Sequence, residues 1–413
     1  MKNSVMPKKV YAAAGGNSVF MGPGRKEFNP KKEMPGFLDY LREATTITLK
    51  QIPNQAFDEG IIGNFMAARF IRQGNLAAFL PEIVPDLLYK PCYRAEGACS
   101  SGGLAVTMGI KSILTGLSDS VFVCGFEIQN SVKALYGADI LAGAAFHQKE
   151  RREGHAYFFP DLFSQRAGAY MKKYGKDLSR LGMANWYKNA IENARHYPQA
   201  QEFHNNKSDL LKTGMTQPDK NSFVEFLNLY DCSKVSDGAS SIVICSEEGL
   251  KKLGITKDKA VEIVAFNNST ANICQTPHDL CELPNTRHSV KQSLKMCKAS
   301  SSDLGLLELH DCFSITALLA LEAAGICKKG KSPAFIAEGE TRRDGKLPVN
   351  LSGGLCGFGH PTGATGVRQM TDLISQFNSA AQNQAELKKD LGMMINMGGN
   401  DKTLTTVIVK KAQ

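Results

Sequence analysis

Several features that would indicate a membrane-spanning, secreted or nucleic-acid-binding protein are missing from this sequence. No stretch approaches the roughly 18 continuous apolar residues that a membrane-spanning helix needs. Residues 1–9 contain no apolar core of the length found in signal peptides, and residues 411–413 are not the common peroxisomal tripeptide. We therefore expect no membrane span and a cytoplasmic location by default, with an unrecognised mitochondrial or peroxisomal signal left open.

The cysteines and the basic residues also lack the patterns of a structural or nucleic-acid-binding role. The 11 cysteines are odd in number and include no Cys-x-x-Cys pair, which argues against a disulfide framework and against a structural zinc site. The net charge is +9, but the basic residues are dispersed and not interleaved with aromatics, so nucleic-acid binding is not predicted. Free thiols suit a reducing compartment, and the positive charge would help to attract a ligand that carries several phosphates.

The sequence does contain apolar segments in an order that occurs twice. Its 413 residues are 43% hydrophobic and 22% charged, which is typical of a soluble globular protein with two or three domains. Strands are predicted at residues 10–14, 60–65, 90–95, 121–126 and 241–245, and again at 261–266, 304–309, 348–350, 392–396 and 405–409. Helices are predicted between them, at residues 36–51, 67–88, 103–116, 289–297, 315–324 and from 366 to about 377. Each half thus reads β-α-β-α-β-α-β-β, which predicts a duplicated α/β fold with a mainly parallel sheet covered on both faces.

Residues 129–230 have no counterpart in the second half. This segment is rich in His, Arg, Tyr, Asn and Lys, and amphipathic helices are predicted at residues 165–174 and 177–194. We interpret it as a loop domain inserted between the fourth and fifth strands of the first half, where such insertions often cover a site. The predicted division is an N-terminal half at residues 1–128 and 231–258, the insertion at 129–230, and a C-terminal half at 259–413.

A turn of small residues at positions 96–103 presents one cysteine, Cys99, and an apolar run follows at once. We interpret the run as a buried helix whose first turn holds Cys99. Unpaired backbone N–H groups at a helix start favour a thiolate over a thiol, and Gly102 and Gly103 leave the sulfur open to approach. These features indicate a nucleophile. A buried structural cysteine is the alternative, because cysteine is among the commonest interior residues.

Three further motifs lie near predicted strand ends of the second half. Residues 310–313 read His-Asp-Cys-Phe, His360 lies in a turn rich in glycine, and residues 396–399 read Asn-Met-Gly-Gly. Ligand sites of open α/β sheets lie at the C-terminal ends of the strands, so packing of the two halves about a pseudo-twofold axis would bring these motifs to Cys99.

Each motif is weak when it is taken singly. His360 is equally consistent with an ordinary turn residue and with an acid or base. His310 and Cys312 supply two ligands for a metal ion, which is too few for a site. Gly357 and Gly359 lack the spacing of a dinucleotide-binding fingerprint.

Together and in this order, the motifs resemble those of a thiolase. The resemblance rests on Gly-Ala-Cys-Ser-Ser-Gly-Gly around Cys99, on residues 310–313, on Gly-His-Pro-x-Gly-Ala-Thr-Gly at 359–366 and on residues 396–399, and it covers nearly the whole chain. Most thiolases have Asn-Glu-Ala-Phe in place of His-Asp-Cys-Phe, and a cysteine in place of Asn396. Both departures occur together in the sterol-carrier-protein type, to which the chain is similar. The resemblance implies a five-layered αβαβα thiolase fold of two duplicated βαβαβαββ halves with an inserted loop domain.

The same resemblance implies an acyl-CoA acyltransferase that cleaves 3-ketoacyl-CoA with free CoA, or runs the reverse Claisen condensation, in lipid metabolism such as fatty acid β-oxidation. Cys99 would attack the keto carbon and carry the acyl group, and His360 would take its proton. Cys312 would replace the missing thiol and exchange the proton at the enolate carbon of acetyl-CoA, while His310 and His360 hold the enolate oxygen. The backbone N–H groups of Cys99 and Gly398 would hold the tetrahedral oxyanion. Coenzyme A is then a substrate, and no cofactor or metal ion is expected.

The resemblance has implications for partners as well. The insertion would contact CoA, and Arg151, Arg152 and Arg166 could meet its phosphates, although solvated surface arginines are the simpler interpretation. The strand before Cys99 would form a homodimer, or a dimer of dimers. Two alternatives stay open: a condensing enzyme of the same fold, of the ketoacyl synthase or hydroxymethylglutaryl-CoA synthase type, and a catalytically silent thiolase-like protein that binds lipid or a partner. The second thiol, at Cys312, disfavours the first alternative, and the intact motifs disfavour the second.

Overall fold

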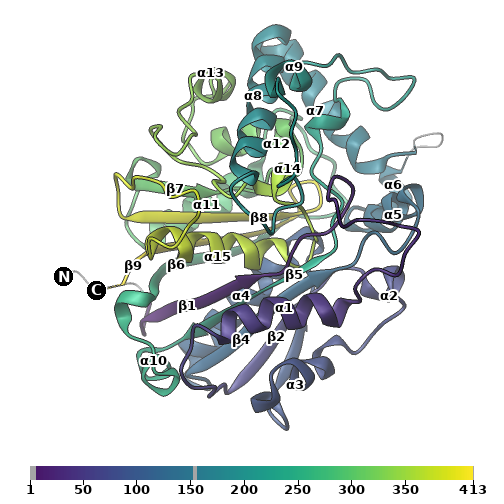
Figure 1. The fold of residues 1–413 in the computed structure, drawn as a ribbon. Coiled ribbons are helices and arrows are strands. Elements are labelled where there is room, and N and C mark those ends of the chain that lie inside the picture. Colours follow the sequence, from purple (N-terminus) through teal and green to yellow (C-terminus); the bar gives the residue numbers. More distant parts are fainter. Residues whose placement is uncertain (1–5, 152–155, 413) are drawn as a thin grey trace.

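The computed structural model describes residues 6–151 and 156–412, and its strands form a nine-stranded sheet in the order β3-β2-β4-β5-β1-β6-β9-β8-β7 (Figure 1). The strands are β1 (Val10–Asn17), β2 (Glu59–Gly63), β3 (Cys92–Ala95), β4 (Ser120–Glu127), β5 (Gly238–Cys245), β6 (Val261–Thr270), β7 (Leu304–Glu308), β8 (Leu391–Gly398) and β9 (Thr403–Lys411). The longer helices are α1 (Phe37–Leu49), α4 (Ser101–Thr115), α5 (Ala134–Leu141), α7 (Phe158–Tyr174), α8 (Lys176–Ala194), α10 (Glu247–Leu253), α11 (Pro284–Met296), α12 (Ser314–Ala323) and α15 (Thr365–Phe377). The shorter helices are α2 (Ala67–Phe70), α3 (Leu80–Ile83), α6 (His147–Glu150), α9 (Leu210–Gly214), α13 (Ser332–Ala337) and α14 (Gly354–Gly357).

The strand order confirms the duplication that the sequence predicts. Read outward from the centre of the sheet, the first half runs β1-β5-β4-β2-β3 and the second half runs β6-β9-β8-β7. A parallel bridge between Leu307 and Val349 adds a short segment beside β7, at the place that β3 occupies beside β2. The halves join where β1 pairs antiparallel with β6, with Val10 opposite Ile263.

The prediction of a mainly parallel sheet is wrong. Among the described strands, β2 is parallel to β3 and to β4, and β7 is parallel to β8, but the other five pairings are antiparallel. The last strand of each half causes the difference, because β5 and β9 each lie between two strands that run the opposite way. In the second half a short turn leads from β8 into β9, and short turns connect antiparallel neighbours.

Two helices form the layer between the half-sheets. Helix α4 packs on β2, β4 and β5, helix α15 packs on β1, β5 and β8, and the two helices pack on each other. Their apolar residues join one buried cluster with strand residues of both halves. Helix α1 covers the outer face of the first half, and α11 with α12 covers that of the second, which gives the five layers that the resemblance implies (Figure 1).

Glycines bring the N-terminal ends of α4 and α15 together. A Cβ atom on Gly102 would lie 2.7 Å from the carbonyl oxygen of Gly363, and one on Gly366 would lie 2.2 Å from the backbone nitrogen of Gly103. Any larger residue would force the two helices apart at this point. The close approach places the first-half turn that carries Cys99 beside the second-half turn that carries His360.

The helical region predicted at residues 67–88 consists of several short helices and 3₁₀ turns. Helix α2 ends at Phe70, and Asn75 adopts a left-handed φ of 49°. Pro81 is the second residue of α3, and Pro85 is the first residue of a separate 3₁₀ turn. Proline removes a backbone donor inside a helix, so it fits the first turns of these pieces and not the middle of one long helix.

The inserted segment packs over the second half at the top of Figure 1. Helices α7 and α8 include the two predicted there, and α8 packs on α12, α13 and α14. The division at residues 129–230 stays a prediction; it is supported by β5, which follows the insertion and pairs with β1 and β4.

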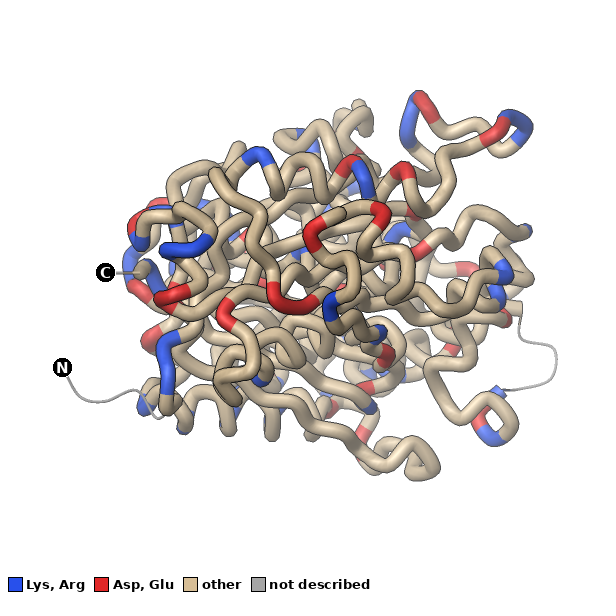
Figure 2. The backbone as a smooth tube through the Cα atoms, turned by 90° about the horizontal axis from the view of Figure 1, so that it is seen from below, with Lys and Arg blue, Asp and Glu red and all other residues tan. Residues whose placement is uncertain are grey.

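Charged residues are spread over the molecule. Figure 2 shows Lys and Arg interspersed with Asp and Glu along the backbone. In the described part of the chain, no helix is both long and apolar enough to cross a membrane.

Candidate active site

Cys99 lies in a single 3₁₀ turn, η3 (Ala98–Ser100), immediately before α4. Ala98 has a φ of 54°, a conformation that side chains rarely adopt, and hydrogen bonds hold it there. The Ser101 hydroxyl donates to the carbonyl of Ala98 and accepts from the N–H of Gly97, while Ser100 donates to the carbonyl of Asn396 in β8. The turn that presents Cys99 is therefore tied to the second half of the molecule.

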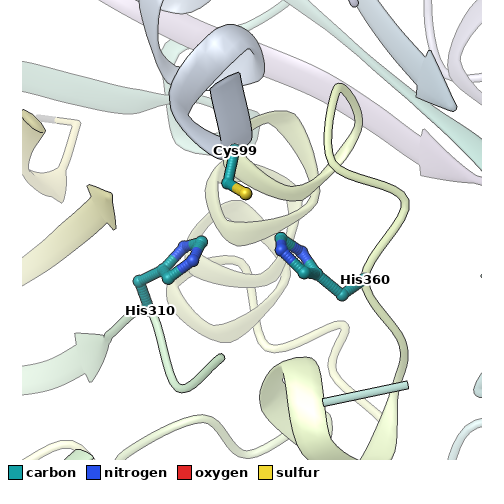
Figure 3. A group of neighbouring side chains, drawn as sticks. All are labelled: Cys99, His310 and His360. Atoms are coloured by element: carbon teal, nitrogen blue, oxygen red, sulfur yellow. The ribbon is translucent and has the colours of Figure 1, made fainter. Parts of the chain in front are cut away.

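One cavity of about 440 Å³ joins the predicted catalytic side chains, which are Cys99, His310, Cys312 and His360. They come from loops that follow β3 and β7 and from the turn before α15. Cys99 and Cys312 line the same cavity, as expected if the two halves pack with these strand ends together. The Cys99 sulfur and one ring nitrogen of each histidine lie within 4.8 Å of one another. Figure 3 shows the Cys99 side chain pointing toward the space between the two imidazoles.

The two rings stand almost at right angles, with centroids 5.1 Å apart and an interplanar angle of 83°. Burial and the positive charge of Arg368 lower the pKa of His360 to about 3. Burial, His360 and Arg368 lower the pKa of His310 well below its usual value. Both imidazoles are therefore neutral near pH 7 and available as a hydrogen-bond donor or a base.

The thiol of Cys99 is also neutral at rest, so the expected thiolate is wrong. Burial raises the pKa of Cys99 to about 12, and the negative charge of Glu127 adds to the rise. Hydrogen bonds from the backbone of Gly399 and of Cys99 itself lower this pKa by less. The helix-start effect is thus outweighed by the loss of water around the sulfur. Cys99 needs a base beside it to act as a nucleophile.

The backbone amide that meets the Cys99 sulfur is that of Gly399, one residue after the predicted Gly398. Gly399 follows β8 with a φ of 66° and lines the cavity. Gly398 packs against the first half instead, since a Cβ atom there would lie 2.1 Å from the carbonyl oxygen of Gly97. A motif of two adjacent glycines does not reveal which N–H points at the sulfur.

Asp311, between His310 and Cys312, anchors the loop that carries both. Its carboxylate accepts from the indole N–H of Trp186 at 3.0 Å, from the Asn350 side chain at 2.9 Å and from the Leu355 N–H at 2.8 Å. Burial raises the pKa of Asp311 to about 6, although these donors favour its charged form. Sequence reasoning missed this role, for which the only signal was an aspartate between two candidate residues.

Cys312 is more deeply buried than Cys99. Burial raises the pKa of its thiol, and the hydroxyl of Thr316, 3.5 Å from the sulfur, lowers it by less. The backbone carbonyl of Cys312 accepts from Ser233, which follows the insertion.

The structure describes two of the three arginines named from the sequence, Arg151 and Arg166. Arg166 is fully buried, so the surface interpretation is wrong for it; it donates to the carbonyls of Leu280 and Glu282 and to the Asn400 side chain. Arg151 pairs with Asp139. Arg152 lies outside the described residues.

Comparisons with known proteins agree with the motifs. A family model described as the thiolase N-terminal domain matches residues 39–248, and one described as thiolase C-terminal domain-like matches residues 267–411. An acetyl-CoA acetyltransferase of Methanothermobacter thermautotrophicus is 30% identical over 379 residues, covering 91% of this chain and 94% of that protein. Sterol carrier protein 2 of Rattus norvegicus is 27% identical over 412 residues, covering 96% of this chain and 71% of that protein. Among solved structures, the Ltp2-ChsH2(DUF35) aldolase superposes with a TM-score of 0.77 at 17% identity, covering 99% of both chains.

Proposed function

The chain belongs to the thiolase family, in its sterol-carrier-protein type, and we propose that it cleaves 3-ketoacyl-CoA with CoA, and catalyses the reverse condensation, through an acyl group carried on Cys99. One observation carries the proposal: a neutral thiol, two neutral imidazoles and a second thiol line the same cavity. Acyl transfer needs a nucleophile with a base, and carbon–carbon cleavage needs a further group that can protonate carbon.

In the proposed cleavage, His360 accepts the proton of Cys99 as the sulfur bonds to the keto carbon. The N–H groups of Cys99 and Gly399 hold the oxyanion, and removing one such donor typically costs about 3 kcal/mol of barrier. The bond to the α carbon then breaks, and Cys312 gives its proton to the carbon of the acetyl-CoA enolate. His310 and the protonated His360 stabilise the enolate oxygen.

The second half of the reaction restores both thiols. Incoming CoA gives its thiol proton to the Cys312 thiolate, and its sulfur attacks the acyl group on Cys99. The shortened acyl-CoA leaves, and the Cys99 thiolate recovers its proton from His360. The raised pKa of the Cys312 thiol suits this role, because a weakly acidic thiol gives a strongly basic thiolate for a proton on carbon.

The cavity is much larger than an acetyl group requires. Its wall includes aromatic and aliphatic side chains from both the insertion and the second half. Those from the insertion include Leu141, Tyr157, Phe159, Phe163 and Phe223, and Phe313 comes from the second half. We infer that acyl groups larger than acetyl fit here, which a series of 3-ketoacyl-CoA chain lengths in a thiolysis assay would test.

A homodimer formed through β3 belongs to the same proposal. Strand β3 is at the edge of the sheet, paired only with β2 among the described strands, and Tyr93 on it is 48% exposed. Unpaired strand edges readily take a second strand.

The experiment that tests the proposal combines turnover with acyl capture. The protein is incubated with a 3-ketoacyl-CoA and free CoA, and mass spectrometry locates the acyl group after rapid quenching. We expect acetyl-CoA, a shortened acyl-CoA and an acyl group on the Cys99 peptide alone. A synthase of the same fold would fail to cleave with free CoA, and a silent binding protein would carry no acyl group.

A further inference from the structure

Asn396, at the position where most thiolases have a cysteine, is fully buried in β8 beneath both Cys99 and His310. Its side-chain oxygen accepts from the N–H of Gly103 at 3.1 Å. Its side-chain nitrogen lies 3.2 Å from the carbonyl oxygen of Cys99 and 3.2 Å from Nδ1 of His310. The one amide therefore contacts both halves of the site.

These contacts fix which way the amide faces. The Gly103 N–H can only donate, so it must meet the amide oxygen, and the Cys99 carbonyl can only accept, so it must meet the amide nitrogen. The same nitrogen then directs its second hydrogen at Nδ1 of His310. A hydrogen bond forms there only if Nδ1 carries a lone pair, which leaves the ring proton on Nε2.

We propose that Asn396 is a positioning residue that holds His310 with its proton on Nε2, so that this N–H is directed into the cavity toward the oxygen of the enolate. The inference rests on the proposed function for the identity of that oxygen. The assignment of the ring proton itself rests on the hydrogen bonds alone.

His360 is held in the opposite form. Its Nδ1 lies 2.6 Å from the Thr365 hydroxyl oxygen, and that hydroxyl donates its only hydrogen to the carbonyl of Pro361 at 3.0 Å. Nδ1 of His360 must then be the donor, which leaves Nε2 with a lone pair as the base for Cys99. The two imidazoles are consequently not interchangeable, because one enters the reaction as a donor and the other as an acceptor.

The surroundings leave room for this amide and for little else. A Cβ atom on Gly103 would lie 2.7 Å from the Asn396 oxygen, and one on Gly366 would lie 2.4 Å from it. A cationic His310 would direct a hydrogen from Nδ1 against the amide hydrogens, so Asn396 and burial both oppose the charged form. A protonated Nε2 on His310 has no lone pair to give to a metal ion. Cys99, His310 and His360 are therefore a poor cation site in this form.

The first test reads the ring protons directly. Long-range ¹⁵N–¹H NMR spectra of the full chain labelled at histidine distinguish protonated from bare ring nitrogens, and a His310→Gln variant assigns the signals among the eight histidines. In the unsubstituted protein we expect a bare Nδ1 and a protonated Nε2 on His310. A protonated Nδ1 with a bare Nε2 would overturn the inference.

The second test reverses the contact. Asn396→Asp keeps an oxygen for Gly103 but faces His310 with an acceptor, so the ring proton should move to Nδ1. Cleavage and condensation should fall by about 100-fold, the usual effect of losing one oxyanion donor. Acylation of Cys99 by a saturated acyl-CoA forms no enolate, so it should fall much less than cleavage does, and only through the lost hydrogen bond to the Cys99 carbonyl.

Two further variants separate positioning from general damage. Asn396→Ala, which removes the donor without adding charge, should leave a mixture of both ring forms and a smaller loss of turnover. Asn383→Asp is the matched control, since Asn383 is also buried and donates through its amide, to Asn193 and to the carbonyl of Leu351. It should lower stability and leave the His310 signals in place.

The outcomes distinguish this inference from the proposed function. If His310 shows the expected protons but Cys99 takes no acyl group, the function fails and the positioning role of Asn396 stands. If the protein cleaves 3-ketoacyl-CoA while Asn396→Asp retains full turnover or keeps the His310 proton on Nε2, the positioning role of Asn396 fails and the proposed function stands. If neither Asn396 variant folds, the spectrum of the unsubstituted protein still decides.

Discussion

The hydroxyl of Thr365 lies 2.6 Å from Nδ1 of His360 and donates its own hydrogen back to the turn, at the carbonyl of Pro361. The backbone of His360 is held as well, because its N–H donates to Ser236 and its carbonyl accepts from Gln129. Ring and backbone are thus both fixed. The His360 side chain faces the cavity with Cys99, and the ring form inferred above leaves the lone pair on Nε2. In the proposed reaction this arrangement supplies the base that a buried thiol needs.

Replacing Thr365 by valine should stop His360 from acting as the base for Cys99, while a side chain of similar volume still fills the position. Valine cannot accept the Nδ1 hydrogen, so the imidazole gains by moving its proton to Nε2, where it no longer accepts from Cys99. We expect acylation of Cys99 to slow by about 100-fold, the lower range for losing a general base, and stability to fall by about 1–3 kcal/mol from the unpaired group. Quenched-flow acylation and urea unfolding measure the two effects. Thr365→Ser keeps the hydroxyl and should restore acylation to within several-fold, whereas equal losses in both variants would contradict the role.

The rate of acylation should not fall near pH 6.5, where a histidine with an ordinary pKa would become protonated. The pKa of His360 is lowered from 6.5 to about 3, and the form that accepts a proton is the neutral ring. A lowered pKa therefore extends the active form toward acid, so the rate constant for acylation should stay nearly level from about pH 7.5 to about pH 5. Acylation with a saturated acyl-CoA, followed by mass spectrometry at constant ionic strength, gives the profile. A half-maximal rate near 6.5 would show that His360 is exposed to solvent or is not the base.

Trp186, from the insertion, should stabilise the loop that carries His310 and Cys312 through one hydrogen bond to Asp311. Trp186→Phe keeps most of the packing but leaves a buried carboxylate oxygen short of one donor, which should cost about 1–3 kcal/mol of unfolding free energy. In an Asp311→Asn background the same change should cost less, and the difference measures the coupling of the pair. Circular dichroism is the readout, since the chain has one tryptophan and the variant removes it. Equal costs in both backgrounds would assign the effect to packing.

The motifs around Cys99, His310, Cys312 and His360 could be found from the sequence because the residues that shape each turn are its neighbours in the chain. The repeat was visible for the same reason, since apolar strands and helices of similar length follow in the same order. These patterns gave the order of strands and helices along the chain, whereas the order of the strands in the sheet came only from the structure.

Properties set by contacts between distant segments could not be found in this way. The direction of β5 depends on pairing across an insertion, and the pKa of Cys99 depends on how fully the second half covers it. Asn396 shows the limit best: the sequence showed only a missing thiol, because its partners Gly103 and His310 lie 293 and 86 residues away.

Cys312→Ala should separate the two halves of the proposed chemistry. Alanine cannot give a proton to the enolate carbon or remove one from it, so thiolysis and condensation should both become undetectable. Acylation of Cys99 by a saturated acyl-CoA breaks no carbon–carbon bond and should persist at a similar rate. The variant removes one sulfur from a packed loop, and Thr316, 3.5 Å from that sulfur, keeps its place in α12, so unfolding should occur at a similar urea concentration. Cys356→Ala is the control, because that buried thiol donates to the carbonyl of Asp311 and does not line the cavity. Near-normal thiolysis by Cys312→Ala would remove Cys312 from the mechanism, and another group would have to protonate the enolate carbon of acetyl-CoA.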